Sequence, residues 1–258
     1  MNEATTARVI QFTFAGSPLR AQAERVDRVH TNVLFITLIR SKFIQYVATG
    51  LSLLPGFLLQ PLQRLLPPQF YLPGRLVLKT RKPDWGDEFA NEKVMYQRLE
   101  PLQGRIMPRF LGDAEFNGIP SIVLSRLEGS PSYKQGPTAL PADDFERQLK
   151  VLLQEFTKFG VIYDDPKLDN FLVVKGKVMV VDLESVCEED KQDQELAVES
   201  HRLHIMPQYR RCLESLSNHN SEKETITNST GWTSPRPSYT EIVRTTPKSY
   251  PSNVRTDL

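Results

Sequence analysis

Three oxygen-bearing side chains in the C-terminal half of the sequence lie in a pattern that could bind a metal ion. Asp165 and Asn170 precede a short apolar segment, and Asp182 follows a second one. The two segments, 171–174 and 178–181, are rich in β-branched residues and are joined by Lys-Gly-Lys, which predicts a β-hairpin. Because a hairpin brings its outer ends side by side, we expect Asn170 and Asp182 to be neighbours. Carboxylate and amide oxygens are the ligands that Mg²⁺ prefers.

A lysine and a glutamate further upstream form a second pattern. Lys79 lies near the end of a predicted strand over 75–80, and Glu92 lies in a predicted helix over 88–99. The other residues on the helix face of Glu92 are apolar: Phe89, Tyr96 and Leu99. A lysine on an apolar strand needs an anion beside it, and a glutamate on an apolar helix face needs a cation. We therefore expect the two side chains to pair.

Residues 163–170 and 180–184 resemble the catalytic loop and metal-binding motif of the protein-kinase-like superfamily. The superfamily pattern is H-R-D-L-x-x-x-N, followed after a hairpin by D-F-G, and the strings here are YDDPKLDN and VVDLE. The resemblance implies that Asp165 orients or deprotonates an acceptor hydroxyl, while Asn170 and Asp182 hold Mg²⁺ at the phosphates of ATP. The D-L-E form is more similar to small atypical kinases and aminoglycoside-type phosphotransferases than to regulated protein kinases.

The upstream residues match the same superfamily in the same order. Lys79 resembles the strand lysine that contacts the α and β phosphates, and Glu92 resembles the helix glutamate that pairs with it. Residues 89–99 also follow the rhythm F-x-x-E-x-x-x-Y-x-x-L that is common in the superfamily.

Three further segments carry the resemblance. Residues 124–129 are similar to the hinge between kinase lobes, so the backbone around Ser125 and Leu127 is expected to hold the adenine. Lys167 matches a position that helps to bind the γ-phosphate, with a solvated surface lysine as the alternative. Residues 102–112 are similar to a stretch shared by short fungal proteins with a kinase-like domain.

The sequence departs from the kinase pattern in three ways. No G-x-G-x-x-G precedes Lys79, so the loop that covers the phosphates is replaced or lost. No A-P-E follows Asp182, and too little foldable chain remains for a complete C-terminal lobe. Tyr163 and Asp164 replace the His and Arg of the catalytic loop. These departures favour a rival function, a pseudokinase that binds nucleotide or acts as a scaffold without turnover. A small-molecule kinase with the same site is a third interpretation.

Each site residue also has a simpler interpretation when it is considered alone. Alone, Lys79 is explained as a solvated lysine on a strand, and Glu92 as an ordinary surface residue. Asp165 and Asn170 suit a turn, and Asp182 suits the end of a strand. Only their order and spacing together favour a nucleotide site.

Composition gives no support to several classes of protein. A formal charge of +1 over 258 residues provides no basic field for binding nucleic acid. Two cysteines, Cys187 and Cys212, make neither a disulfide framework nor a zinc site. The N-terminus lacks a secretory signal pattern, so a cytoplasmic or nuclear protein is expected. Nothing in the sequence indicates the oligomeric state.

One apolar stretch, 43–59, raises the question of membrane contact. It is short for a membrane span and contains Gln45 and Pro55. These features favour a buried or amphipathic segment over a transmembrane helix, with an interfacial helix as the remaining alternative.

The expected fold is α+β and kinase-like, with a small antiparallel-sheet N-lobe and a truncated, mainly helical C-lobe. The expected regions are an N-terminal extension with candidate first strands (1–70), the N-lobe with its hinge (71–129), the truncated C-lobe with the catalytic loop (130–215) and a disordered tail rich in Ser, Thr, Asn and Pro (216–258). The remaining elements expected are strands at 7–14, 32–38 and 161–163, a hairpin with its turn at Asn117-Gly118, and helices at 41–66, 143–159 and 191–215. The helix at 143–159 is expected to be capped by Asp143 or Asp144 and to bury one apolar face: Phe145, Leu149, Leu152, Leu153 and Phe156.

Overall fold

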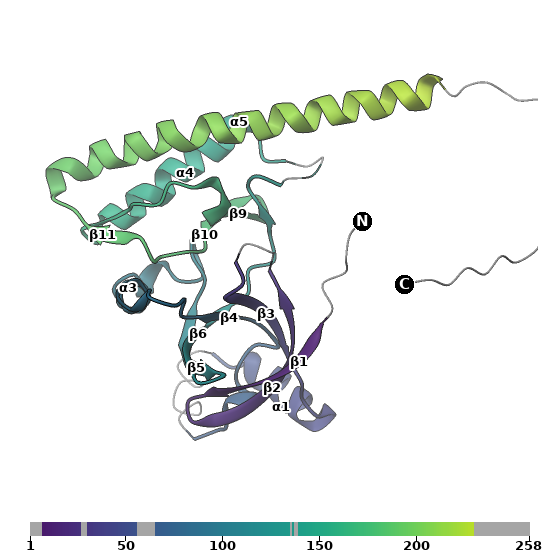
Figure 1. The fold of residues 1–258 in the computed structure, drawn as a ribbon, viewed down its shortest axis with the longest axis vertical. Helices are drawn as coiled ribbons and strands as arrows, with labels where there is room; N and C mark the ends of the chain where they lie inside the picture. Colours follow the sequence, from purple (N-terminus) through teal and green to yellow (C-terminus); the bar gives the residue numbers. More distant parts are fainter. Residues whose placement is uncertain (1–6, 27–29, 56–64, 135, 137–138, 230–258) are drawn as a thin grey trace, which may run out of the picture. The chain divides into compact units, whose positions relative to one another are not determined.

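The N-terminal part of the chain forms a closed six-stranded barrel, which lies in the lower half of Figure 1. The computed structural model describes residues 7–26, 30–55, 65–134, 136 and 139–229. Antiparallel neighbours follow the order β1-β2-β3-β4-β6-β5. The bounds are β1 (Arg8–Phe14), β2 (Ser17–Arg25), β3 (Val33–Leu38), β4 (Arg75–Thr80), β5 (Phe110–Phe116) and β6 (Ile119–Ser125).

Alternation of buried and exposed residues explains the barrel core. In β1, Ile10, Phe12 and Phe14 are buried and the residues between them are exposed, as expected for side chains that alternate across a strand. The strands expected at 7–14 and 32–38 are confirmed as β1 and β3.

Sequence reasoning missed β2 and the closure of the barrel. The buried residues of β2 include Ala21 and Ala23, and alanine gives a weak strand signal. Its hairpin with β1 turns at Ala15-Gly16, where φ is 48° and 74°, as in the primed turns that suit two-residue hairpins. Pairing of β1 with β5, through Thr13 and Phe14, then closes the sheet on itself.

A predicted hairpin of the barrel and a predicted helix are confirmed. The hairpin of β5 and β6 turns at Asn117-Gly118, where φ is 53° and 75°. Helix α3 (Gly86–Arg98) connects β4 to β5 through the short helix η2 (Glu100–Leu102). The predicted apolar face is buried, Glu92 included: Phe89, Glu92, Tyr96 and Leu99.

The C-terminal part packs around a second hydrophobic core. Helix α4 (Ala142–Thr157) buries the predicted face Phe145, Leu149, Leu152, Leu153 and Phe156. The other elements of this part are β7 (Ser130–Pro131), β8 (Val161–Tyr163), η3 (Leu168–Asn170), β9 (Phe171–Val174), β10 (Lys177–Val180), β11 (Val186–Glu188) and α5 (Lys191–Ser229). Two small sheets result, one with the order β10-β9-β7 and one that pairs β11 with β8. The molecule is therefore of mixed α+β content.

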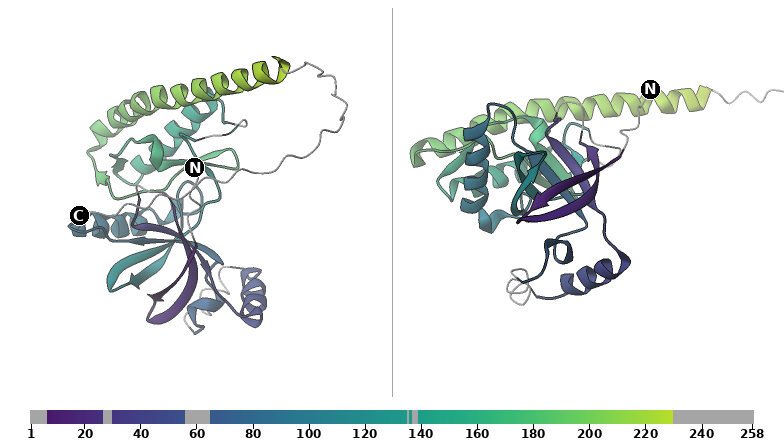
Figure 2. Two further views of the ribbon diagram at one scale, coloured as in Figure 1. Left: turned by 45° about the vertical axis from the view of Figure 1, so that its right-hand side comes forward. Right: turned by 60° about the horizontal axis from the view of Figure 1, so that its bottom comes forward.

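Contacts between α4 and the first half of α5 close this core. The rings of Phe145 and Tyr209 stack with centroids 3.8 Å apart, and the Tyr209 hydroxyl donates to the Leu140 carbonyl at 2.6 Å. The two helices accordingly run side by side in Figure 1 and in the left view of Figure 2.

Two local details of the prediction are corrected. Asp143 and Asp144 do not cap α4; the N-cap is Pro141, and the two aspartates lie in the first turn, where their charge suits the helix dipole. The hairpin of β9 and β10 turns through two residues, Lys175-Gly176, because both adopt positive φ and Lys177 already pairs with Val174.

Only the first part of the expected helix at 41–66 is seen as a helix in the described residues. Helix α1 covers Lys42–Ser52, residues 56–64 lie outside the described residues, and a short helix η1 covers Pro68–Phe70. No described helix is long and apolar enough to cross a bilayer.

The chain divides into two units, 1–217 and 218–258. Helix α5 continues to Ser229, beyond the expected end at 215, so the first residues assigned to the tail are helical. The rest of the predicted disordered tail, 230–258, lies outside the described residues.

Gly129 provides a test of the packing that follows β6. A side-chain carbon here would lie 2.6 Å from Val174 Cγ2 and 2.7 Å from the Val173 carbonyl oxygen. Gly129→Ala therefore forces this segment away from β9, and we expect it to lower the free energy of unfolding by about 1–3 kcal/mol in urea titrations. Gly136→Ala is the control, because a carbon at Gly136 meets nothing within 4 Å. Equal stability of the two variants would contradict this packing.

Candidate functional site

A single buried ammonium group gathers three carboxylates. Lys79, which is 5 % exposed, lies on β4 opposite Val33 of β3. Its Nζ lies 2.8 Å from Glu92 Oε2, 2.9 Å from Asp182 Oδ1 and 2.9 Å from Glu184 Oε1. The pairing of Lys79 with Glu92 expected from the sequence is present. We call these four residues the Lys79 cluster.

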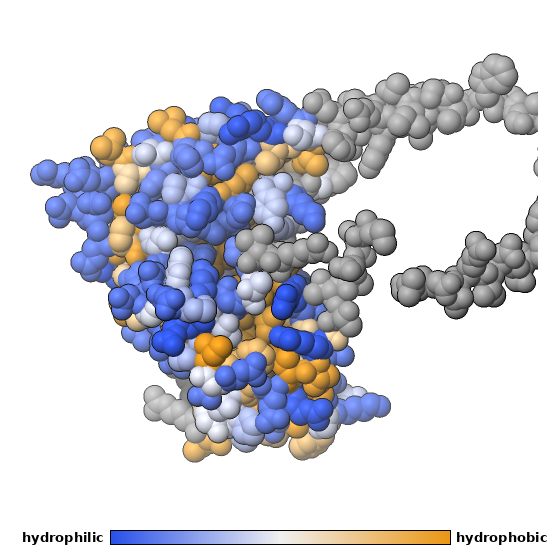
Figure 3. Space-filling model, in the orientation of Figure 1, coloured by the Kyte–Doolittle hydropathy of each residue, from blue (hydrophilic) through white to orange (hydrophobic). Residues whose placement is uncertain are grey.

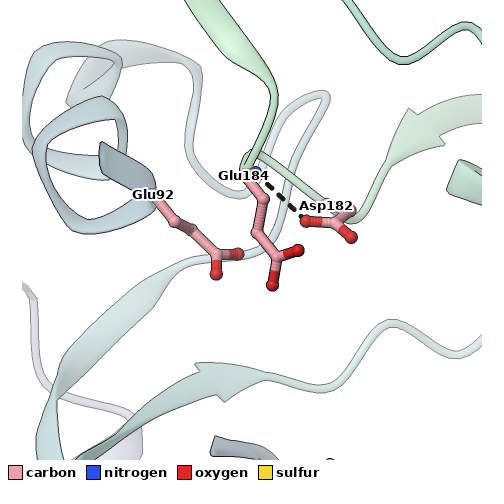
Figure 4. Close-up of side chains that lie close together, drawn as sticks. All are labelled: Glu92, Asp182 and Glu184. Atoms are coloured by element: carbon pink, nitrogen blue, oxygen red, sulfur yellow. Dashed lines mark hydrogen bonds between the residues drawn. The ribbon is translucent and has the colours of Figure 1, made fainter. Parts of the chain in front are cut away.

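The carboxylates reach this point from two separate segments. Figure 4 shows Glu92 extending from α3, and Asp182 and Glu184 from the segment after β10. Asp182 Oδ1 also accepts from the backbone N–H of Glu184 at 3.1 Å. The spacing of two residues therefore directs both acidic side chains towards Lys79.

Three residues at this site escaped the sequence reasoning. Glu184, the last residue of the D-L-E string, bonds a second lysine, Lys82, at 2.7 Å. The amide of Asn91 donates to the carbonyls of Glu184 and Val186 at 3.1 Å and 2.8 Å, which fixes this segment against α3. The D-L-E string was the sequence signal for Glu184, because it has a charged residue where the kinase pattern has glycine, and a charged residue needs partners.

The cluster holds more negative than positive charge, since three carboxylates face Lys79 and Lys82. Burial disfavours the ammonium form of Lys79, but the three carboxylates outweigh this and raise its pKa above the ordinary value. Burial raises the pKa of Glu92 to about 7, with Asp182 and Glu184 adding to the rise and Lys79 opposing it. Although burial opposes the charged form of Asp182, Lys79 lowers the pKa of that carboxyl. Lys79 and Asp182 are therefore both charged at neutral pH.

A second group of side chains forms on the segment between β8 and β9. The amide nitrogen of Asn170 donates to Asp165 Oδ2 at 3.0 Å, and Lys167 Nζ lies 3.1 Å from Asp165 Oδ1. Asn170 is 8 % exposed, whereas the side chain of Lys167 is 70 % exposed. We call these three residues the Asp165 group.

The backbone links the Asp165 group to the Lys79 cluster. The N–H of Val181 donates to the carbonyl of Asn170 at 3.0 Å, so the outer ends of the hairpin lie together, as the sequence indicated. Charges from both groups act on Tyr163: burial, and then the charges of Asp182 and Asp165, raise its pKa well above the ordinary value. Its phenol is therefore neutral. Among the described residues, no hydrogen bond joins the side chains of Asn170 and Asp182.

The predicted hinge residues follow the barrel sheet: Ser125 ends β6, and Leu127 lies in the segment between β6 and β7. The Ser125 N–H donates to the Arg109 carbonyl at 2.9 Å, and its hydroxyl accepts from the Arg109 N–H at 2.8 Å. Leu127 is half-buried between Arg126, which stacks over the ring of Phe35 at 4.1 Å, and Glu128. Within the described part of the chain, neither Ser125 nor Leu127 bonds the Lys79 cluster or the Asp165 group.

Comparison with known proteins does not assign a family. No family model and no curated protein matches the chain. A crystal structure of a mutant form of the Mycobacterium tuberculosis PknI kinase domain aligns at 13% identity and a TM-score of 0.48 over 81% of this chain and 78% of that chain. A further crystal structure of the M. tuberculosis PknI kinase domain aligns at 15% identity and a TM-score of 0.45 over 76% and 74%. The likeness is too low to carry a functional argument, which therefore rests on the site itself.

The raised pKa of Glu92 predicts a pH dependence of stability. The folded protein binds this proton more tightly than the unfolded chain, so the group lowers stability progressively as pH rises from 4.5 to about 7. We expect the wild type to lose stability relative to Glu92→Gln over this interval, in denaturant titrations without divalent ions. Glu88→Gln, at an exposed position of the same helix, is the control and should follow the wild type. Parallel curves for wild type and Glu92→Gln would contradict the assignment.

Proposed function

We propose that this protein is an ATP- and Mg²⁺-dependent phosphotransferase with a two-lobed, kinase-like fold, acting on a hydroxyl group of a protein or a small molecule. The observation that carries the proposal is the buried ion pair of Lys79 and Glu92, with Asp182 2.9 Å from the same ammonium. Phosphoryl transfer depends on positioned charge more than on covalent chemistry, and a fixed lysine beside a metal-type aspartate supplies it.

Lys79 is the residue that would bind the phosphates of ATP. Glu92 is a positioning residue: it is 0 % exposed, comes from a different element and holds the ammonium in place. Charge-assisted bonds between a lysine and phosphate oxygens are strong, so a preset ammonium favours nucleotide binding.

Asp165 is the residue that would accept the proton of the acceptor hydroxyl. Its side chain is 23 % exposed, so a hydroxyl from solvent can approach it. The bonds from Asn170 and Lys167 orient the carboxylate, as a general base requires. Lys167 reaches into solvent beside it, where it would contact a phosphate.

The oxygen donors at this place fit Mg²⁺. Asp182 is the most exposed carboxylate of the Lys79 cluster, with 27 % of its side chain accessible. Asn170 donates through its amide nitrogen, which leaves the amide oxygen to coordinate. Mg²⁺, when bound to these two residues, neutralises the charge on the phosphates.

Nucleotide binding requires Lys79 to exchange partners. Its ammonium already contacts Asp182 and Glu184, so a phosphate has to replace at least one of them. Glu184 keeps a second cation, Lys82, when Lys79 leaves it. We infer that the pair of Glu184 and Lys82 lowers the cost of this exchange.

The rival function is a pseudokinase or scaffold without turnover, and two observations favour it. The ammonium of Lys79 already pairs with three carboxylates, so its charge is compensated without a nucleotide phosphate. Residues 26–32 connect β2 to β3 at the end of the barrel where Val33 pairs with Lys79. They contain no glycine, the residue whose backbone can approach a phosphate most closely.

Thermal stability measures nucleotide binding directly. We expect Mg²⁺ and ATP together to raise the melting temperature of the full chain, because ligand binding to the folded state stabilises it. Asp182→Ala should abolish the Mg²⁺-dependent part of this rise, whereas Asp169→Ala, at an exposed position of η3, should retain it. Absence of any rise with the wild type would reject both the enzyme and a nucleotide-binding pseudokinase.

Turnover separates the enzyme from the pseudokinase. We expect slow Mg²⁺-dependent ATP hydrolysis that falls by about 10²-fold or more in Asp165→Ala, while ATP binding is retained. Hydrolysis at the same rate in wild type and variant, or no hydrolysis by a wild type that binds ATP, would support the rival function.

Competition between Glu184 and phosphate predicts the effect of a third variant. Glu184→Gln removes one anion from Lys79 and keeps the side-chain shape, so we expect ATP to bind roughly tenfold more tightly in calorimetric titrations. Glu188→Gln, at an exposed position of β11, is the matched control. Weaker or unchanged ATP binding by Glu184→Gln would show that Glu184 does not compete for the lysine.

A further inference from the structure

Helix α1 carries two apolar stripes, and only one of them faces the protein. Ile44, Val47, Ala48 and Leu51 follow the helical spacing i, i+3, i+4, i+7 and are half-buried. A second stripe faces solvent: Phe43 is 70 % exposed, Tyr46 79 % and Leu53, at the C-cap, 82 %. None of the described side chains of α1 is buried.

The segment that contains α1 is nevertheless firmly joined to the barrel. Arg40 donates to the Leu72 carbonyl at 2.6 Å, and the Leu38 N–H donates to the Gly74 carbonyl at 2.9 Å. Leu72 is buried in the barrel core. These hydrogen bonds hold the two ends of the segment together, and in the right view of Figure 2 α1 lies below the barrel strands, set apart from them.

Charge in this segment has one sign. Residues 39–74 contain three basic residues, Arg40, Lys42 and Arg64, and no aspartate or glutamate. Lys42 is exposed and directly precedes Phe43. The face of the molecule drawn in Figure 3 is mostly hydrophilic, with a continuous apolar patch in its lower half.

We propose that the stripe of Phe43, Tyr46 and Leu53, together with Lys42, docks the protein on the surface of an anionic phospholipid membrane. Aromatic and aliphatic side chains insert at the level of the headgroups, and a neighbouring lysine pairs with anionic lipid. A protein partner of ordinary composition would bring basic as well as acidic groups, and its basic groups would find no acidic residue on this segment. An anionic lipid surface brings negative charge, which matches a segment without acidic residues.

The position of α1 is compatible with the proposed nucleotide site. The segment leaves β3 at Leu38 and returns at Arg75, whereas Lys79 pairs with Val33 at the other end of these strands. Lys79 lies four residues further along the strand than Arg75, a rise of about 14 Å. A membrane at α1 therefore leaves the Lys79 cluster open to the aqueous side.

Vesicle co-sedimentation of the full chain tests this inference without nucleotide. We expect binding to vesicles of phosphatidylcholine mixed with phosphatidylserine, weaker binding to phosphatidylcholine alone, and loss of binding at high salt. The triple variant Phe43→Ser, Tyr46→Ser, Leu53→Ser should bind at least about tenfold more weakly. Lys42→Ala should bind the anionic vesicles about fivefold more weakly.

The double variant Leu196→Ser, Leu203→Ser is the matched control, because these residues of α5 are also exposed, at 70 % and 62 %. It should bind vesicles like the wild type. The inference is overturned if the wild type does not bind anionic vesicles, or if the triple variant binds as tightly. It is also overturned if light scattering shows a wild-type dimer that the triple variant loses while no protein binds vesicles, since α1 would then contact a second copy of the chain.

Discussion

The buried ammonium of Lys79 is the constraint on which the rest of this structure depends. A charge in an apolar interior has to be paired, and removing the partner of a buried ion typically costs about 3–5 kcal/mol. Three segments meet this need: β4 presents the lysine, α3 supplies Glu92, and the chain after β10 supplies Asp182 and Glu184. The pairing thereby joins the barrel, the helix beside it and the C-terminal part of the molecule at one point.

The same pairing gives the proposed function its particular character. Three carboxylates fix the position of the Lys79 ammonium, which favours binding of an anionic ligand. The same carboxylates already compensate its charge, so a ligand has to compete with them. Nucleotide binding then becomes an exchange of anions at one cation, in which Lys82 keeps Glu184 paired. In the proposed function, turnover of ATP would depend on Asp165, which lies in a separate group linked to the cluster through the Val181–Asn170 backbone bond.

Sequence reasoning was sufficient where a local signal encodes the answer. The buried face of α3, the turn at Asn117-Gly118 and the face of α4 follow from helical spacing and turn chemistry. The contact of Lys79 with Glu92 was predictable because each needs an opposite charge. Barrel closure was not, since the pairing of β1 with β5 is non-local and the alanines of β2 give a weak signal. Lys82 and Asn91 likewise have ordinary surface spacing, and only the folded chain brings them to Glu184.

The ammonium group of Lys79 can be observed directly by ¹⁵N NMR of lysine-labelled protein, because burial slows exchange of its protons. Titration with Mg²⁺ and ATP should shift the Lys79 ammonium resonance as phosphate replaces a carboxylate, while the backbone amide resonance of Lys177, on β10, should stay unchanged. A Lys79 resonance that does not move when nucleotide is bound at saturation would contradict the account, because the cation at its centre would then take no part in binding.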